Sequence, residues 1–229
     1  MSSELKVYRL GVCLYPGCTV TDFQGPVEFF GLFNTVNRKL FAALYKKLPD
    51  AVIEIEYLSH NMEPITPTQG PKILPSMTFK QGLETDFDIL LTPGGIPRPS
   101  EAPPDIVEFL KAKGPKTEYV LSVCTGSWFL AAAGLLQGKR ATTNKALYKV
   151  IVEDTKDLNI TWVPKARWVV NDDKHIWTAS GVTAGMDLAH AFLTHLFDKS
   201  FADEVKAIVE FRTTDDAEED EFATYYGLV

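Results

Sequence analysis

The sequence predicts a single-domain α/β fold of the flavodoxin-like kind, in which helices flank a mainly parallel sheet. The first observation is a repeated order of apolar strand, small-residue loop and helix along the chain. The second is size, because 229 residues, 45% of them hydrophobic, are enough for one large core. We therefore expect residues 1–229 to form one domain, with an acidic C-terminal extension over about 212–229.

The stretch 119–131 organises this prediction. It begins as an apolar, β-branched run, reaches Cys124, and continues through Thr125 and Gly126 into an Ala/Leu-rich helical pattern. A strand that turns this sharply into a helix lifts the thiol clear of the sheet, as in a nucleophile elbow. The N–H groups at the start of the helix would favour the thiolate. The alternative is that Cys124 is a buried core cysteine.

The first strand is expected at 7–15, and a helix with Pro26 near its first turn follows it. Asp22 lies between them and has two interpretations. It could cap the helix, or it could place an acid at the edge where α/β sheets carry their sites.

The remaining elements follow from periodicity and from turn residues. Residues 63–79 contain four prolines and predict an irregular arm, and the acidic residues 215–221 predict a solvated tail. Further strands are expected at 51–58, 87–92, 166–171 and 174–179, and helices at 106–113, 129–136, 144–155, 186–197 and 201–210.

Small-residue loops follow several of these strands, and in a doubly wound sheet such loops open onto one crevice. Gly94 and Gly95 could offer backbone N–H groups to a developing anion, and residues 181–183 form another loop of this kind. A thiol, an acid, backbone donors and a hydroxyl would then converge, as nucleophilic catalysis requires. None of the four histidines lies on these loops.

Composition limits the partners. The formal net charge of −7 and the absence of a basic run argue against nucleic-acid binding. Three cysteines, with no paired spacing and no metal-ligand pair, predict reduced thiols and no metal. No apolar run is long enough to span a membrane, and residues 1–6 lack a signal-like apolar core. We expect a cytoplasmic protein that acts on a small molecule without a cofactor.

Five motifs, taken in order, cover almost the whole chain. They are residues 15–28, 92–95, 123–126, 131–143 and 180–187. Together they resemble the PfpI superfamily, which includes the Parkinson disease protein and the class I glutamine amidotransferase-like fold. Asp22 combined with Cys124 and Thr125 resembles the isocyanide hydratase branch of that superfamily.

The resemblance implies roles for these residues. Cys124 would be the nucleophile, Asp22 the acid and base, and Thr125 an orienting residue. Backbone groups of Gly94, Gly95 and Thr125 would stabilise negative charge. The pocket would be lined by Gly181, Val182 and Thr183. A homodimer is also implied.

One position departs from the pattern, because relatives often carry a histidine where this chain has Asn144. The change affects the lining of the pocket and therefore the substrate.

The resemblance implies hydration of an isocyanide to an N-substituted formamide through a Cys124 thioimidate. A glyoxalase- or deglycase-like reaction on an α-oxoaldehyde is the alternative enzyme. A non-enzymatic alternative is an oxidative-stress sensor or chaperone-like protein that uses Cys124. A ligand-sensing domain like those found beside helix-turn-helix modules is a further class.

Overall fold

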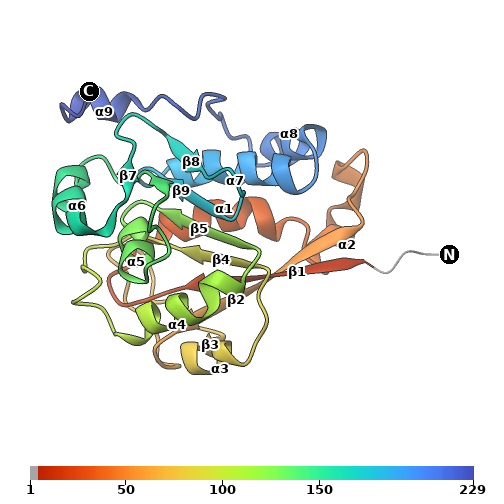
Figure 1. Ribbon diagram of the computed structural model, residues 1–229. Helices are drawn as coiled ribbons and strands as arrows, with labels where there is room; N and C mark the ends of the chain where they lie inside the picture. Colours follow the sequence, from red (N-terminus) through yellow and green to blue (C-terminus); the bar gives the residue numbers. More distant parts are fainter. Residues whose placement is uncertain (1–4) are drawn as a thin grey trace.

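The computed structural model describes residues 5–229. Residues 1–4, which belong to the segment 1–6 predicted to lack a signal-like core, lie outside the described residues. Its central sheet confirms the predicted α/β fold (Figure 1). The strands of this sheet are β1 (Lys6–Cys13), β2 (Ala51–Ser59), β3 (Met77–Thr78), β4 (Ile89–Thr92), β5 (Tyr119–Val123), β8 (Trp168–Val170) and β9 (Ile176–Ala179).

The strand order is β3-β2-β1-β4-β5-β9-β8. Each pair of neighbours is parallel except β8 and β9, which lie within the predicted strands 166–171 and 174–179 and form an antiparallel hairpin. A second, two-stranded parallel sheet joins β6 (Arg140–Ala141) to β7 (Thr161–Trp162).

Helices cover both faces of the sheet (Figure 1). On one face, α1 (Val20–Gly31) packs against α7 (Ala184–Leu196), which also contacts α8 (Lys199–Ile208). On the other face, α4 (Asp105–Lys113) packs between α3 (Phe79–Leu83) and α5 (Gly126–Ala132). The shorter helices are α2 (Asn37–Leu40), α6 (Tyr148–Asp154) and α9 (Glu221–Tyr225), with 3₁₀ turns at Ala42–Leu44, Gly114–Lys116 and Lys156–Leu158.

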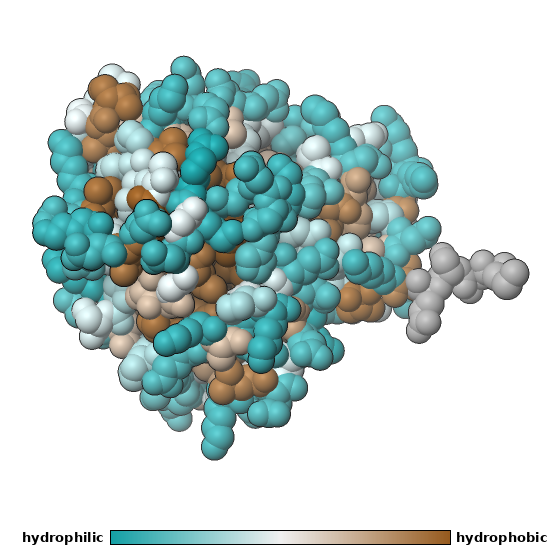
Figure 2. All heavy atoms as spheres, in the orientation of Figure 1, coloured by the Kyte–Doolittle hydropathy of each residue, from teal (hydrophilic) through white to brown (hydrophobic). Residues whose placement is uncertain are grey.

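The core forms between these layers because the central strands are covered on both faces. Leu10 and Val12 of β1 are completely buried. Phe33 packs edge-on against Phe197 and Phe201, with ring centroids 5.5 and 5.1 Å away, and so ties the end of α1 to α8. On the face seen in Figure 2, hydrophilic side chains cover most of the surface and hydrophobic ones lie in small separate groups.

Several predicted boundaries were wrong for local reasons. Pro26 lies inside α1 rather than near its first turn, because the helix already begins at Val20. Helix α5 ends at Ala132 instead of 136, where Gly134 adopts a φ of 77° that terminates the helical path. Helix α6 begins at Tyr148, several residues after the predicted start at 144.

Two segments have more structure than predicted. The proline-rich arm at 63–79 ends in the edge strand β3, which pairs with β2. The acidic C-terminal segment was predicted to be solvated, but Asp220 is buried and caps α9 by accepting a hydrogen bond from the Phe222 N–H. The prediction failed because a run of acidic residues does not reveal buried cationic partners elsewhere in the chain.

The strand order places a site at one edge of the sheet. Strand β1 lies between β2 and β4, so the order reverses there, and ligands bind outside the carboxyl ends of strands at such a point. Asp22 follows β1, Gly94 follows β4 and Cys124 follows β5. The topology thus brings together three residues that are far apart in the sequence.

Gly94 is expected to be essential to this arrangement. A Cβ at Gly94 would lie 2.7 Å from Thr125 Oγ1 and 2.8 Å from Cys124 Cβ, too close for a side chain. We expect Gly94→Ala to lower the free energy of unfolding by about 1–3 kcal/mol through overpacking, as measured by denaturant unfolding. Gly31→Ala is the matched control, since its nearest neighbour would lie at an ordinary 3.7 Å; equal stability of the two variants would contradict the prediction.

Candidate active site

Cys124 lies on a strained turn between β5 and α5. Its φ of 61° is rare for a residue with a side chain and places the thiol at the nucleophile-elbow position predicted from the sequence. Backbone and side-chain hydrogen bonds hold the turn. The Cys124 N–H donates to the Ser180 carbonyl at 2.9 Å, and the Cys124 carbonyl accepts from the hydroxyls of Thr143 and Ser127 at 3.1 and 3.2 Å.

Asp22 faces this thiol from the first turn of α1. Its carboxyl group is completely buried, and Oδ2 accepts a hydrogen bond from the Gly94 N–H at 2.9 Å. Oδ1 has no hydrogen-bond partner. The N-cap of α1 is Thr19, so Asp22 does not cap the helix. Of the two interpretations from the sequence, the geometry favours the acid.

Burial raises the pKa of Asp22 to about 7, although the hydrogen bond from the Gly94 N–H and the neighbouring Cys124 thiol act in the opposite direction. A carboxyl group with this pKa can hold a proton or release it near neutral pH. This property suits a general acid and base.

The Cys124 thiol does not show the lowered pKa that its helix N-terminus led us to expect. Burial, followed by repulsion from the Asp22 carboxylate, raises its pKa to about 12. Hydrogen bonding by the Thr125 and Val182 N–H groups and by the Asn144 side chain opposes that rise only in part. The free site therefore holds a thiol, and the nearest group able to take its proton is Asp22.

The N–H groups of both predicted glycine donors are already engaged. The Gly94 N–H binds Asp22, and the Gly95 N–H donates to Thr125 Oγ1 at 2.9 Å. The Thr125 hydroxyl donates in return to the Gly95 carbonyl at 3.0 Å. The two glycines therefore position Asp22 and Thr125 and do not offer free donors to an anion. The N–H groups of Thr125 and Val182 face the sulfur instead.

The predicted pocket loop lies beside the nucleophile. Gly181 approaches Asn144 so closely that a Cβ on it would lie 2.6 Å from Asn144 Nδ2. Val182 has a strained φ of 29°. Thr183 is exposed, and its hydroxyl accepts a hydrogen bond from Arg167 at 3.2 Å. The structure thus brings Gly181 and Val182 to Cys124, while Thr183 lies further out.

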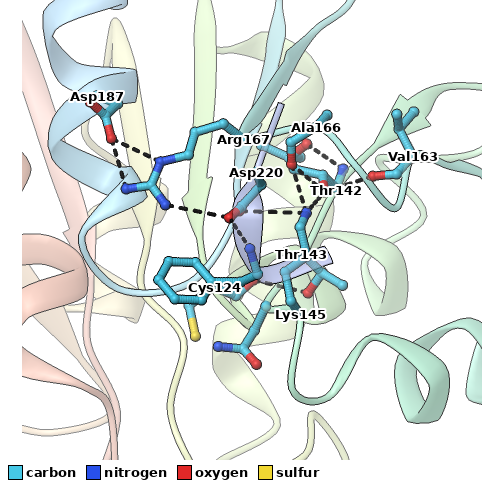
Figure 3. A network of polar contacts seen from close by, with 12 residues as sticks. Cys124, Thr142, Thr143, Lys145, Val163, Ala166, Arg167, Asp187 and Asp220 are labelled. Atoms are coloured by element: carbon cyan, nitrogen blue, oxygen red, sulfur yellow. Dashed lines mark hydrogen bonds and ion pairs between the residues drawn. The ribbon is translucent and has the colours of Figure 1, made fainter. Parts of the chain in front are cut away.

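Sequence reasoning missed several neighbours of the site. The buried Tyr15 hydroxyl donates to the Pro93 carbonyl at 3.1 Å. Cys18 is completely buried, and its backbone forms a bridge to Gly95. A buried network that includes Lys145 and Asp220 lies behind the site (Figure 3). The apolar run that precedes Tyr15 could have indicated that its side chain is buried. Nothing in the local sequence indicates that Lys145 and Asp220 form an ion pair.

Two of the histidines form pairs with aspartates. His60 pairs with Asp105 at 2.8 Å, and His190 pairs with Asp203 at 3.0 Å. Within residues 5–229, no group of three histidine, cysteine, aspartate or glutamate side chains is placed to hold a metal ion. No helix in the same range is long and apolar enough to cross a membrane.

Comparison with known proteins identifies the family. A match to the DJ-1/PfpI family covers residues 28–195. The chain belongs to this family. It is 28% identical over 204 residues to the isonitrile hydratase of Pseudomonas putida, a match that covers 89% of this chain and 78% of the relative. It is also 29% identical over 139 residues to a deglycase of Pyrococcus abyssi, covering 60% of this chain and 79% of that relative.

Solved structures support the same DJ-1/PfpI fold. A ThiJ/PfpI family protein from Pseudomonas syringae superposes with a TM-score of 0.74 at 25% identity, covering 99% of this chain and 87% of the other. Drosophila melanogaster DJ-1beta superposes with a TM-score of 0.68 at 17% identity, covering 90% and 99%. The catalytic roles of individual residues stay predictions.

We expect alkylation to single out Cys124. Cys13 and Cys18 are completely buried, whereas Cys124 is 6% exposed. Iodoacetamide treatment of the native protein, followed by peptide mapping, should label Cys124 first. The same treatment after unfolding should label all three thiols, and faster native labelling of Cys13 or Cys18 would contradict the prediction.

Asp22 should also leave a signature in the pH dependence of stability. Its folded pKa of about 7 lies above the ordinary 3.8, so between these values the folded protein binds the proton more tightly than the unfolded chain does. The Asp22 contribution is full below pH 4 and is lost as pH rises to 7. At about 1.4 kcal/mol per pKa unit, we expect a loss of about 4 kcal/mol. Asp22→Asn should remove this slope in denaturant unfolding, and the exposed Asp157→Asn should keep it.

Proposed function

We propose that this DJ-1/PfpI protein is a cysteine-dependent hydratase that converts an isocyanide and water to an N-substituted formamide. The observation that carries the proposal is the state of Asp22. One oxygen is fixed by the Gly94 N–H, the other has no partner, and the carboxyl group contacts the Cys124 thiol. A proton can therefore move between the Cys124 sulfur, the Asp22 carboxyl group and a bound substrate without passing through bulk water.

In the first step, the Asp22 carboxylate takes the proton of the Cys124 thiol, and the thiolate attacks the terminal carbon of the isocyanide. The new carbon–sulfur bond places an electron pair on that carbon, and protonated Asp22 returns the proton to it. The product is a thioimidate with a carbon–nitrogen double bond, and Asp22 is again a carboxylate.

In the second step, the same carboxylate removes a proton from water as the water oxygen attacks the thioimidate carbon. Protonated Asp22 gives this proton to the nitrogen, which completes a tetrahedral adduct. As the carbon–sulfur bond breaks and the N-substituted formamide leaves, the Asp22 carboxylate takes the proton of the new hydroxyl group and passes it to the departing thiolate. The Thr125 and Val182 N–H groups, which face the sulfur, favour the departing thiolate.

The alternatives receive less support from the site. A redox sensor needs an accessible thiol with a low pKa, whereas Cys124 is almost buried and burial raises its pKa. A deglycase- or glyoxalase-like reaction would use the same thiol, and some relatives carry a deglycase name. Turnover of methylglyoxal beside an isocyanide therefore belongs in the same assay.

Asp22→Asn tests the proposed acid and base. Asparagine keeps the shape of the side chain and can still accept from the Gly94 N–H, but it cannot exchange a proton. We expect kcat for isocyanide hydration to fall by about 10²–10⁴-fold, measured as formamide production, while Cys124 remains open to alkylation.

Cys124→Ala supplies the blank for that assay. Near-native turnover in a folded Asp22→Asn variant would remove Asp22 from the mechanism. Absence of isocyanide turnover by the native protein, together with turnover of methylglyoxal, would replace the hydratase by the α-oxoaldehyde enzyme.

A further inference from the structure

A buried ion pair lies directly behind the proposed site. Lys145 is almost inaccessible, and its Nζ donates to Thr142 Oγ1 at 2.7 Å and to the Ala166 carbonyl at 2.6 Å. The remaining charged partner is Asp220, whose Oδ2 lies 3.9 Å from Nζ and has no hydrogen bond of its own (Figure 3). Both side chains are at least 98% buried, so water solvates neither charge.

Asp220 brings the C-terminal segment into this cluster. Besides capping α9, its Oδ1 lies 3.7 Å from the Arg167 guanidinium. Arg167 forms a closer ion pair with Asp187, at 2.9 Å (Figure 3). The cluster therefore alternates cation and anion from Lys145 to Asp187.

The same C-terminal segment is tied to this cluster at three further points. The Arg167 N–H donates to the Ala217 carbonyl at 2.8 Å. Asp187 Oδ1 accepts hydrogen bonds at 3.0 Å from the Thr213 hydroxyl and from the Thr214 N–H. Residues 213–220 are therefore part of the wall behind the site, although they lie about 90 residues after the nucleophile in sequence.

Lys145 belongs to the segment that holds the nucleophile, because the Thr143 hydroxyl donates to the Cys124 carbonyl at 3.1 Å and Asn144 Nδ2 lies against Gly181 of the pocket loop. The Asn144 side chain also lowers the pKa of the Cys124 thiol, which favours the thiolate. Asn144 Oδ1 accepts a hydrogen bond from the Leu147 N–H at 3.1 Å. The amide NH₂ is therefore the group of this side chain that can donate to the Cys124 sulfur. The direction of this NH₂ depends on where the backbone of residues 142–145 is held.

We propose that the Lys145–Asp220 pair is a positioning device, through which the C-terminal segment holds the Asn144 amide against the Cys124 sulfur. The proposal rests on the nucleophilic role of Cys124 in the proposed function, but it holds for any substrate. Lys145 and Asp220 touch no reacting atom. They act through the position of Asn144.

The charge on Lys145 makes the device sensitive to loss of its partner. The charged groups that face Lys145 are Asp220 and Arg167, and the ring of Tyr148 lies 6.0 Å from Nζ. Burial lowers the pKa of Lys145 to about 8, and Asp220 opposes that effect while Arg167 adds to it. Without Asp220, a charged Lys145 would be buried beside Arg167 alone, which is strongly unfavourable.

The test measures the rate constant for alkylation of Cys124 by iodoacetamide in the full chain. At each pH, the rate constant of the variant is divided by that of the native protein to give a ratio. Asp220→Asn should lower this ratio about 10-fold at pH 6, the effect of losing one hydrogen bond to a charged group. The ratio should recover toward 1 by pH 8.5, because without Asp220 the pKa of Lys145 falls below its native value of about 8 and the side chain loses its proton. Glu218→Gln is the matched control on the same segment, because Glu218 forms only an exposed pair with Arg140 and should leave the ratio near 1.

A second background shows whether the effect passes through Asn144. In Asn144→Ala, Asp220→Asn should cause no further loss, since the amide it positions is absent. If Asp220→Asn does not fold, Lys145→Met in the two backgrounds makes the same comparison, because Asp220 then retains Arg167.

Unchanged alkylation in a folded Asp220→Asn variant, a deficit independent of pH, or an equal deficit in both backgrounds would overturn the proposal. None of these readings needs a substrate. Failure of isocyanide turnover would therefore refute the proposed function and leave this inference standing.

Discussion

The hydrogen bond from the Gly94 N–H to Asp22 Oδ2 is the interaction on which the site depends. It fixes one oxygen of a completely buried carboxyl group and leaves the other without a partner beside Cys124. Only a glycine allows the chain after β4 to come this close to the elbow, because a Cβ would overlap Thr125 and Cys124. The parallel sheet contributes the rest of the geometry, since the reversal of strand order at β1 brings these strand ends together.

Burial affects the two titrating groups of the site in the same direction. It raises the pKa values of both Asp22 and Cys124, because each anion loses contact with water. The two anions also repel each other, so the pair retains at least one proton near neutral pH. A thiol that is protonated at rest is consistent with catalysis when its neighbour is a base that can take this proton and later return it. The strained elbow and the buried acid therefore act as one unit.

Much of this arrangement could be predicted from the sequence because its signals are local. The apolar run before Cys124 and the small residues after it predict the elbow, and strand-end loops predict that Asp22 and Gly94 converge. The engagement of the glycine N–H groups could not be predicted, since a sequence shows donors but not which acceptors reach them. The role of Asp220 was also hidden, because its partner Lys145 lies 75 residues earlier and the surrounding acidic run suggests a solvated tail.

Asn144 changes how such a site responds to pH. A histidine at this position would titrate near neutrality and would add a third titrating group beside Asp22 and Cys124. The Asn144 amide donates at every pH and adds no charge, so its contribution depends only on where it is held. The Leu147 N–H fixes its oxygen, and Lys145 anchors the adjacent backbone. Replacing a titrating ring by an amide thus leaves Asp22 to set the protonation of the reacting pair, and makes the buried charges behind Asn144 responsible for its position.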